Sequence, residues 1–149
     1  MEANQYSCTI SILPKGFKTR PRIFDSSQFL QPTEGEPIRS VVTESKDAVV
    51  VAWYVKPGQT ILPHVHSYGQ DTWTILSGKG EYYLDQVGTT QPIIAGDIVV
   101  AFMGCLHGVI NNGEEPLVFI SVVSPSDAGY HLVSLSEKPD QNTAIAWDC

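Results

Sequence analysis

The sequence predicts an all-β protein, folded as an antiparallel barrel or sandwich with an extended N-terminal arm, and three observations support this fold class. From about Ala48 onward, short apolar runs rich in β-branched and aromatic residues alternate with turn residues. Helical periodicity is hard to find over the same region. The 149 residues, 42% of them hydrophobic, can bury one core but are too few for two ordinary ones. We therefore expect a single domain.

The expected strands follow one another along the middle of the chain. The clearest is VVVAWYV at 49–55, which ends at a Lys-Pro-Gly turn. Two further runs, TWTILS at 72–77 and EYYLD at 81–85, flank the Gly-Lys-Gly tripeptide at 78–80. Because glycine adopts positive φ readily, this tripeptide is expected to close a tight hairpin. The series continues with PII, DIVVAF, HGVI and PLVFISVVS, at 92–94, 97–102, 107–110 and 116–124. About eight strands result.

The two ends of the chain are expected to belong to the same domain. Residues 1–47 predict an N-terminal arm, extended in its proline-bearing part, that packs on the barrel or is exchanged with a neighbouring subunit of a homodimer. The barrel itself is expected over 48–135, followed by a C-terminal tail over 136–149.

Composition and the terminal sequence limit the kinds of molecule that the protein is expected to bind and the cellular compartment in which it is expected. Sixteen acidic residues against nine Lys and Arg give a net charge of −7, which disfavours nucleic acid and anionic membranes and favours a small-molecule substrate. The N-terminus lacks the features of a signal peptide, and no run approaches the roughly 18 apolar residues that span a bilayer, so a cytoplasmic protein is expected. Cys8, Cys105 and Cys149 are widely spaced and are expected to be free thiols.

The candidate functional residues lie in two glycine-bounded stretches, 58–78 and 96–111. His64 and His66 are two apart, so in a strand they project from one face and can bind the same metal ion. Asp71 is placed to add a carboxylate from the next strand. Gln70 is its rival, because a β-bulge could exchange which of the two side chains faces the ion. His107 can complete the site from across the barrel.

Three further residues are candidates for the lining of a pocket beside this site. Trp73 shares a face of its strand with Asp71, and Cys105 shares one with His107. Tyr82 is a candidate proton donor. Imidazole nitrogens together with a carboxylate suit a divalent transition metal such as Fe²⁺, Zn²⁺, Mn²⁺ or Ni²⁺.

The spacing of these residues resembles the two sequence motifs of the cupin superfamily. The first motif is matched by Gly58, His64, His66, Asp71 and Gly78. The second is matched by Gly96, Gly104, His107 and Asn111. Two departures stand out: Asp71 replaces the family's Glu, and Phe102 stands at the position of the family's Pro.

The resemblance implies a jelly-roll barrel in which three histidines and usually one Glu hold a metal, frequently within a dimer. It implies His64, His66 and His107 as ligands, whereas Asp71 could bind directly, bind through water or leave a three-histidine site. An Fe(II)-type dioxygenase acting on a small organic molecule is favoured, because strong acid or base candidates beyond the ligands are scarce. The alternatives are a non-redox metal enzyme (polyketide cyclase, isomerase or lyase), a non-catalytic small-molecule or sugar-binding cupin, and a purely structural barrel.

Overall fold

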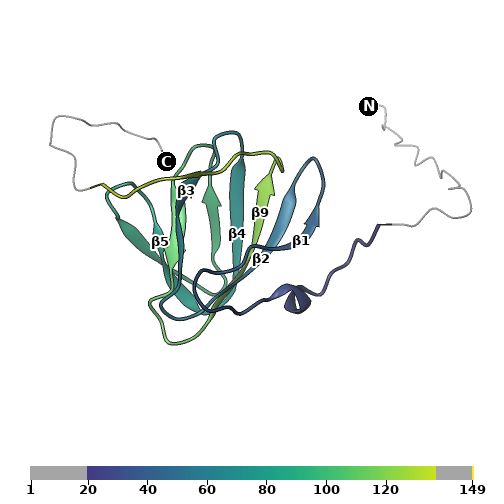
Figure 1. Ribbon diagram of the computed structural model, residues 1–149, viewed down its shortest axis with the longest axis horizontal. Helices are drawn as coiled ribbons and strands as arrows, with labels where there is room; N and C mark the ends of the chain where they lie inside the picture. The colour runs from purple at the N-terminus through teal and green to yellow at the C-terminus, as the bar shows by residue number, and fades with distance from the viewer. Residues whose placement is uncertain (1–19, 137–148) are drawn as a thin grey trace, which may run out of the picture.

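In the computed structural model, which describes residues 20–136 and Cys149, two antiparallel five-stranded sheets face each other (Figure 1). The first sheet contains, in spatial order, β1 (Ser40–Glu44), β2 (Val49–Val55), β9 (Leu117–Ser124), β4 (Gln70–Ser77) and β7 (Ile98–Ala101). The second contains β10 (His131–Leu132), β3 (Thr60–Val65), β8 (His107–Ile110), β5 (Lys79–Tyr83) and β6 (Thr90–Ile94). The all-β prediction is confirmed.

The described chain has ten strands where the sequence predicts about eight, and the two others are β1, with five residues, and β10, with two. Strand β1 lies within the predicted arm of residues 1–47 and pairs with β2 of the same chain. A single 3₁₀ turn, η1 (Ser26–Phe29), precedes it and lies below β1 and β2 in Figure 1. Exchange of the arm within a homodimer stays a prediction, and residues 1–19 lie outside the described part.

No helix among the described residues is both long enough and apolar enough to cross a membrane.

The strands alternate between a buried and an outer face, as the apolar runs predict. In β2, the inward side chains of Val49, Val51 and Val55 are at most 1% exposed. Aromatic rings fill the space between the sheets: Trp73 stacks on Phe119 with ring centroids 4.4 Å apart. Such pairs contribute about 0.5–1.5 kcal/mol beyond the apolar area they bury. The inward faces of both sheets thus form the core against which the site residues are held.

The prediction of a hairpin at residues 78–80 is wrong, because the two strands that flank it do not pair with each other. Strand β4 pairs with β7 and β9, whereas β5 pairs with β6 and β8, so the chain passes from one sheet to the other at Gly78. Gly78 has a φ of +79°, and the backbone of Pro116 lies against it. Glycine is favoured at both a hairpin turn and a corner between sheets, so the local sequence does not distinguish them.

Gly78→Ala is expected to lower the free energy of unfolding by about 2–4 kcal/mol, because a Cβ there adopts a disfavoured φ and also overlaps the Pro116 carbonyl oxygen. Gly58→Ala is the matched control, since Gly58 has a φ of +83° and no atom lies within 4 Å of the place that its Cβ would take. Denaturant unfolding of both variants separates the two contributions. Equal losses would show that the contact with Pro116 is relieved at no cost.

Candidate metal centre

Three strands bring the four candidate ligands together. His64 lies in β3 directly opposite His107 at the start of β8, and His66 follows the end of β3. Asp71, near the start of β4, faces them from the other sheet. All four side chains are buried, and one ligand atom from each lies within 4.8 Å of the others. The cluster that strand alternation predicts is therefore present and could hold a metal ion.

Backbone carbonyls orient all three imidazole rings in the same way. The Nδ1 contacts are His64 to the Leu62 oxygen at 2.7 Å, His66 to the Gly129 oxygen at 2.5 Å and His107 to the Cys105 oxygen at 3.0 Å. A carbonyl oxygen only accepts hydrogen bonds, so each Nδ1 carries the proton and donates it. In the neutral ring, Nε2 then keeps its lone pair, which is the arrangement found in metal-binding histidines.

The Asp71 carboxylate is held on the other side of the cluster by two hydrogen bonds. The Trp73 indole Nε1 donates to its Oδ2 at 2.8 Å, and the Ser121 hydroxyl donates to its Oδ1 at 2.6 Å. Oδ2 also lies 3.3 Å from Nε2 of His107 and 3.6 Å from Nε2 of His66. Asp71 is thus fixed with one oxygen facing the histidines.

Burial and mutual contacts set the charge of the cluster. Burial acts to raise the pKa of Asp71, but contacts with His107, His66 and Ser121 outweigh it and hold this pKa well below its usual range. Burial, together with the neighbouring His107, lowers the pKa of His64 to about 3. At neutral pH the cluster therefore offers a carboxylate and at least one neutral imidazole at His64.

The pKa of His66 shifts in the opposite direction. Burial acts to lower it, but the Asp71 carboxylate and the Gly129 carbonyl outweigh this effect and raise it above its ordinary value, while the charge of Arg39 opposes the rise.

Two observations test whether these residues fit a metal ion. Among the described residues, Nε2 of His107 is buried without a hydrogen-bond partner, although it points into the cluster. Unpaired buried polar atoms are costly and therefore rare. Ligands about 2.1 Å from a zinc ion stand roughly 3.0–3.4 Å apart at octahedral or tetrahedral angles, close to the observed separations of 3.3 and 3.6 Å. The donor set fits a divalent transition metal.

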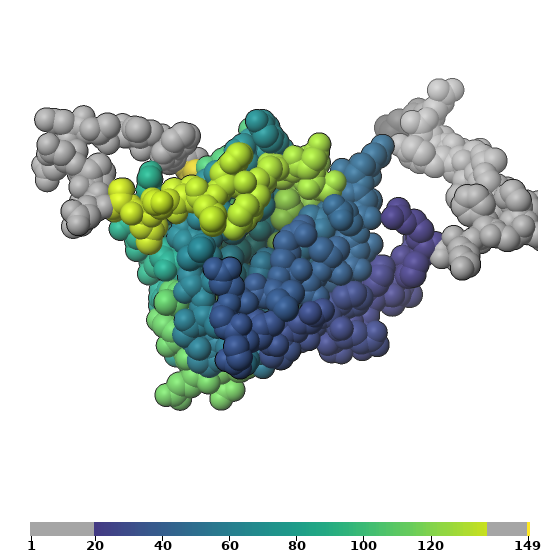
Figure 2. All heavy atoms as spheres, in the orientation of Figure 1, coloured from purple at the N-terminus to yellow at the C-terminus, as the bar shows by residue number. Residues whose placement is uncertain are grey.

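A cavity of about 610 Å³ opens onto the cluster. It is lined by Arg39, Val49, Val51, Trp53, Ile61, His64, His66, Asp71, Ser121, Val123, Ser126, Asp127, Gly129 and Tyr130. Its outer residues come from the segment before β1 and from the segment after β9, which runs across to β3 and is coloured yellow in Figure 2. The Tyr130 ring lies over His64, with centroids 4.8 Å apart. Three of the four candidate ligands thus face this cavity.

The remaining sequence candidates lie elsewhere in the barrel. Trp73 is a core residue that also holds Asp71, and Tyr82 packs edge-on against it, 5.3 Å between centroids. Burial, and then the charge of Asp71, raise the pKa of Tyr82. The Gln70 side chain is exposed and donates to the Thr72 hydroxyl at 3.1 Å. None of these residues lines the cavity.

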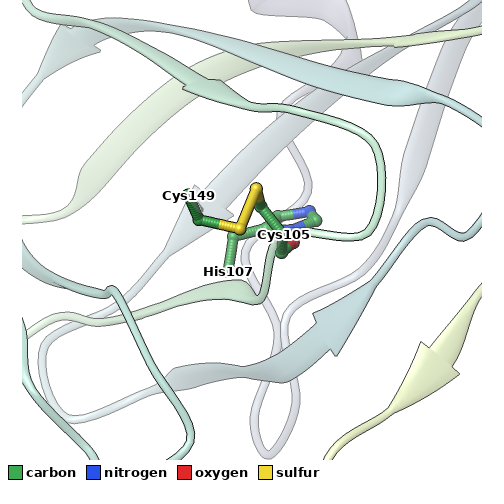
Figure 3. Close-up of a disulfide and its surroundings, with 3 residues drawn as sticks. All are labelled: Cys105, His107 and Cys149. Atoms are coloured by element: carbon green, nitrogen blue, oxygen red, sulfur yellow. Dashed lines mark hydrogen bonds between the residues drawn. A yellow bond between two sulfur atoms is a disulfide. The ribbon is translucent and has the colours of Figure 1, made fainter. Parts of the chain in front are cut away.

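Cys105 forms a disulfide with Cys149, so the expectation of free thiols is wrong for these two residues (Figure 3). Their Cα atoms lie 5.7 Å apart although 44 positions separate them in sequence. Such a pairing cannot be read from spacing, because only the fold brings the two ends of the loop together. The bond lies beside the cluster, since the Cys105 carbonyl is the one that orients His107. Cys8 lies outside the described residues.

Sequence reasoning did not identify three residues of the site. Ser121 lies on the inward face of β9, so its alternation with buried neighbours was an available signal. Arg39 and Tyr130 flank the barrel strands and carry no periodic pattern that marks them. Arg39 directly precedes β1 and Tyr130 lies between β9 and β10, so the packing of these segments on the barrel brings both residues to the cavity.

Known proteins share both the motif region and the fold. A sequence model described as "Cupin domain" matches residues 51–123. A Klebsiella pneumoniae protein with a double-stranded β-helix domain is 49% identical, with a TM-score of 0.74, and the match covers 77% of this chain and 99% of that one.

Two curated relatives match this chain over a smaller share of its length. Germin-like protein 5-1 of Oryza sativa subsp. japonica is 28% identical over 54% of this chain and 37% of its own length. An Aquifex aeolicus protein is 35% identical over 46% of this chain and 54% of its own length. The chain thus spans about a third to a half of these relatives. With the matched motif region, the shared fold and the buried cluster of three histidines and one aspartate, the chain belongs to the cupin superfamily.

Proposed function

We propose that the protein is a metal-dependent enzyme acting on a small organic molecule, and specifically an Fe(II) dioxygenase. The observation that carries this proposal is the placement of the ligand cluster at the inner end of an apolar cavity of about 610 Å³. Cavities of roughly 300–1,000 Å³ are typical of small-molecule sites. His64, His66, His107 and Asp71 would hold the ion, and when bound Fe²⁺ would supply the activation of O₂ and substrate.

The scarcity of acid–base groups supports chemistry supplied by a metal. Apart from the cluster, the described ionisable residues lining the cavity are Arg39, Asp127 and Tyr130. Burial, and then the Glu36 carboxylate, raise the pKa of Tyr130, which makes it a poor acid or base at neutral pH. A hydrolase or epimerase usually needs a positioned acid–base pair.

The chain's own residues would position the ligands and keep water away. The three backbone carbonyls hold the imidazole rings, and Trp73 and Ser121 hold the carboxylate. Val49, Val51 and Val123 present apolar walls to a bound substrate. Dry walls strengthen electrostatic interactions inside the cavity and protect reactive intermediates from water.

Metal analysis combined with O₂ uptake tests the proposal. After mild purification we expect stoichiometric iron, and O₂ consumption with at least one of a catechol, a β-diketone and a thiol. His64→Ala should lower the affinity for iron and the O₂ uptake by more than about 100-fold, since even a residue that only supports a ligand contributes about 10–100-fold, and the iron content should fall with the affinity. Gln70→Ala, which changes an exposed neighbour of Asp71, should preserve both.

Two other results would overturn the dioxygenase. Zinc without O₂ uptake would favour a cyclase, isomerase or lyase. Ligand binding that survives both metal removal and His64→Ala would instead favour a non-catalytic small-molecule or sugar-binding protein.

A further inference from the structure

The cavity has an apolar interior and a charged mouth. Its apolar lining residues are buried or half-buried, whereas Arg39, Asp127 and Tyr130 are exposed. The exposed residues therefore form the rim through which a substrate passes. A molecule that enters meets charge first and apolar walls next.

Arg39 is the one Lys or Arg among the described residues that line this cavity. Its guanidinium forms no hydrogen bond or ion pair with another described side chain or with Asp127, which also lies at the rim. The chain has a net charge of −7, so acidic side chains that could pair with an arginine outnumber the basic ones. Among the described residues, the five N–H donors of this planar fork therefore have no partner at the rim, and the fork matches a carboxylate in two parallel hydrogen bonds.

Charge in the occupied cavity also favours an anion. Asp71 contributes one negative charge and a divalent ion held by the cluster would contribute two positive charges, so the occupied cluster would have a net charge of +1. Among the lining residues at the rim, Arg39 and Asp127 cancel in net charge, and the Glu36 carboxylate acts on Tyr130 from outside the lining. The metal-loaded cavity therefore carries a net positive charge, which complements an anionic substrate and opposes a cationic one.

We propose that the substrate is a small organic carboxylate, whose carboxylate is bound by Arg39 at the rim while its apolar body lies against Val49, Val51 and Val123. This inference rests on the proposed function and names the substrate class of the same site. Arg39 acts here as a specificity residue, separate from the residues that would hold the metal.

Calorimetric binding of matched acids and amides to the Zn²⁺-loaded protein tests the inference without any turnover. The probes are phenylacetate and octanoate, with phenylacetamide and octanamide as neutral counterparts. Wild-type protein should bind the acids more tightly than the amides. Arg39→Gln should weaken the binding of the acids roughly three- to tenfold and leave the amides unchanged, as expected for one charged hydrogen-bonding partner. Arg39→Lys should give an intermediate loss, because the charge is kept but the fork is not.

Lys79→Gln is the matched control, because it removes the same charge from an exposed residue outside the cavity lining. Equal affinities in the Arg39→Gln and Lys79→Gln variants, equal binding of acids and amides, or no saturable binding of either acid would overturn the inference. So would preferential binding of phenethylamine that Asp127→Asn abolishes. Since zinc supports no O₂ chemistry, acid binding through Arg39 can hold where the dioxygenase fails, and the reverse, so the two failures are distinguishable.

Discussion

His107→Ala is expected to lower the affinity for a divalent metal by more than about 100-fold. His107 is 1% exposed, its Nδ1 donates to the Cys105 carbonyl, and its Nε2 faces the cluster with no other partner among the described residues. Residues that only orient a ligand already contribute about 10–100-fold to metal affinity. Loss of a directly facing imidazole should exceed this.

Thermal unfolding with and without Zn²⁺ gives a readout that needs no substrate. At a free zinc concentration about 100 times Kd, the wild-type protein should gain about 2.7 kcal/mol of stability. The His107→Ala variant should gain almost nothing at the same concentration. The increment is compared rather than the absolute stability, because truncation of a buried side chain also leaves a cavity. Gln70→Ala should keep the full increment, and an unchanged increment in His107→Ala would remove His107 from the ligand set.

Cys149→Ser is expected to lower the free energy of unfolding by about 2–4 kcal/mol. The disulfide to Cys105 closes a loop across 44 positions, and a cross-link of this span restricts the unfolded chain by about 4 kcal/mol in the chain-entropy model. Removal of a native disulfide typically costs about 2–5 kcal/mol, which agrees with this figure. Denaturant unfolding under non-reducing conditions measures the loss.

Reduction provides the internal control for this prediction. Dithiothreitol should bring the wild-type protein to the stability of Cys149→Ser and should leave that variant unchanged. The double substitution of Cys105 and Cys149 should cost far less than the sum of the single ones, because each single change breaks the same bond. Full stability of Cys149→Ser, with dithiothreitol also without effect on the wild type, would show that the disulfide does not stabilise the fold.

Local patterns predict the strands better than the connections between them. The run at 49–55 forms β2 with the same bounds, because β-branched and aromatic residues favour an extended backbone wherever they are buried. The tripeptide at 78–80 wrongly predicts a hairpin, since a glycine corner has the same local requirement for positive φ. The strands with which β4 and β5 pair lie elsewhere in the chain, and they decide that the chain changes sheets at Gly78.

The candidate site shows the same division. Alternation along the strands places His64 and His66 on one face, and the structure brings them together with Asp71 and His107; their role as ligands stays a prediction. The hydrogen bonds that hold Asp71 come from Trp73 on its own strand and from Ser121, 50 positions away. Strand alternation places Trp73 on the face of Asp71 and Ser121 on the inward face of β9, but only the pairing of β4 with β9 brings Ser121 to Asp71.

The sequence by itself determined the all-β class, most of the strands and the four residues that meet in the barrel, because side-chain alternation and turn chemistry act over a few residues. The tertiary structure decided the passage between sheets at Gly78, the Cys105–Cys149 bond and the presence of Arg39 at the cavity rim. Each of these depends on residues far apart in the chain, whose approach is set by sheet pairing and by the packing of the segments that close the barrel.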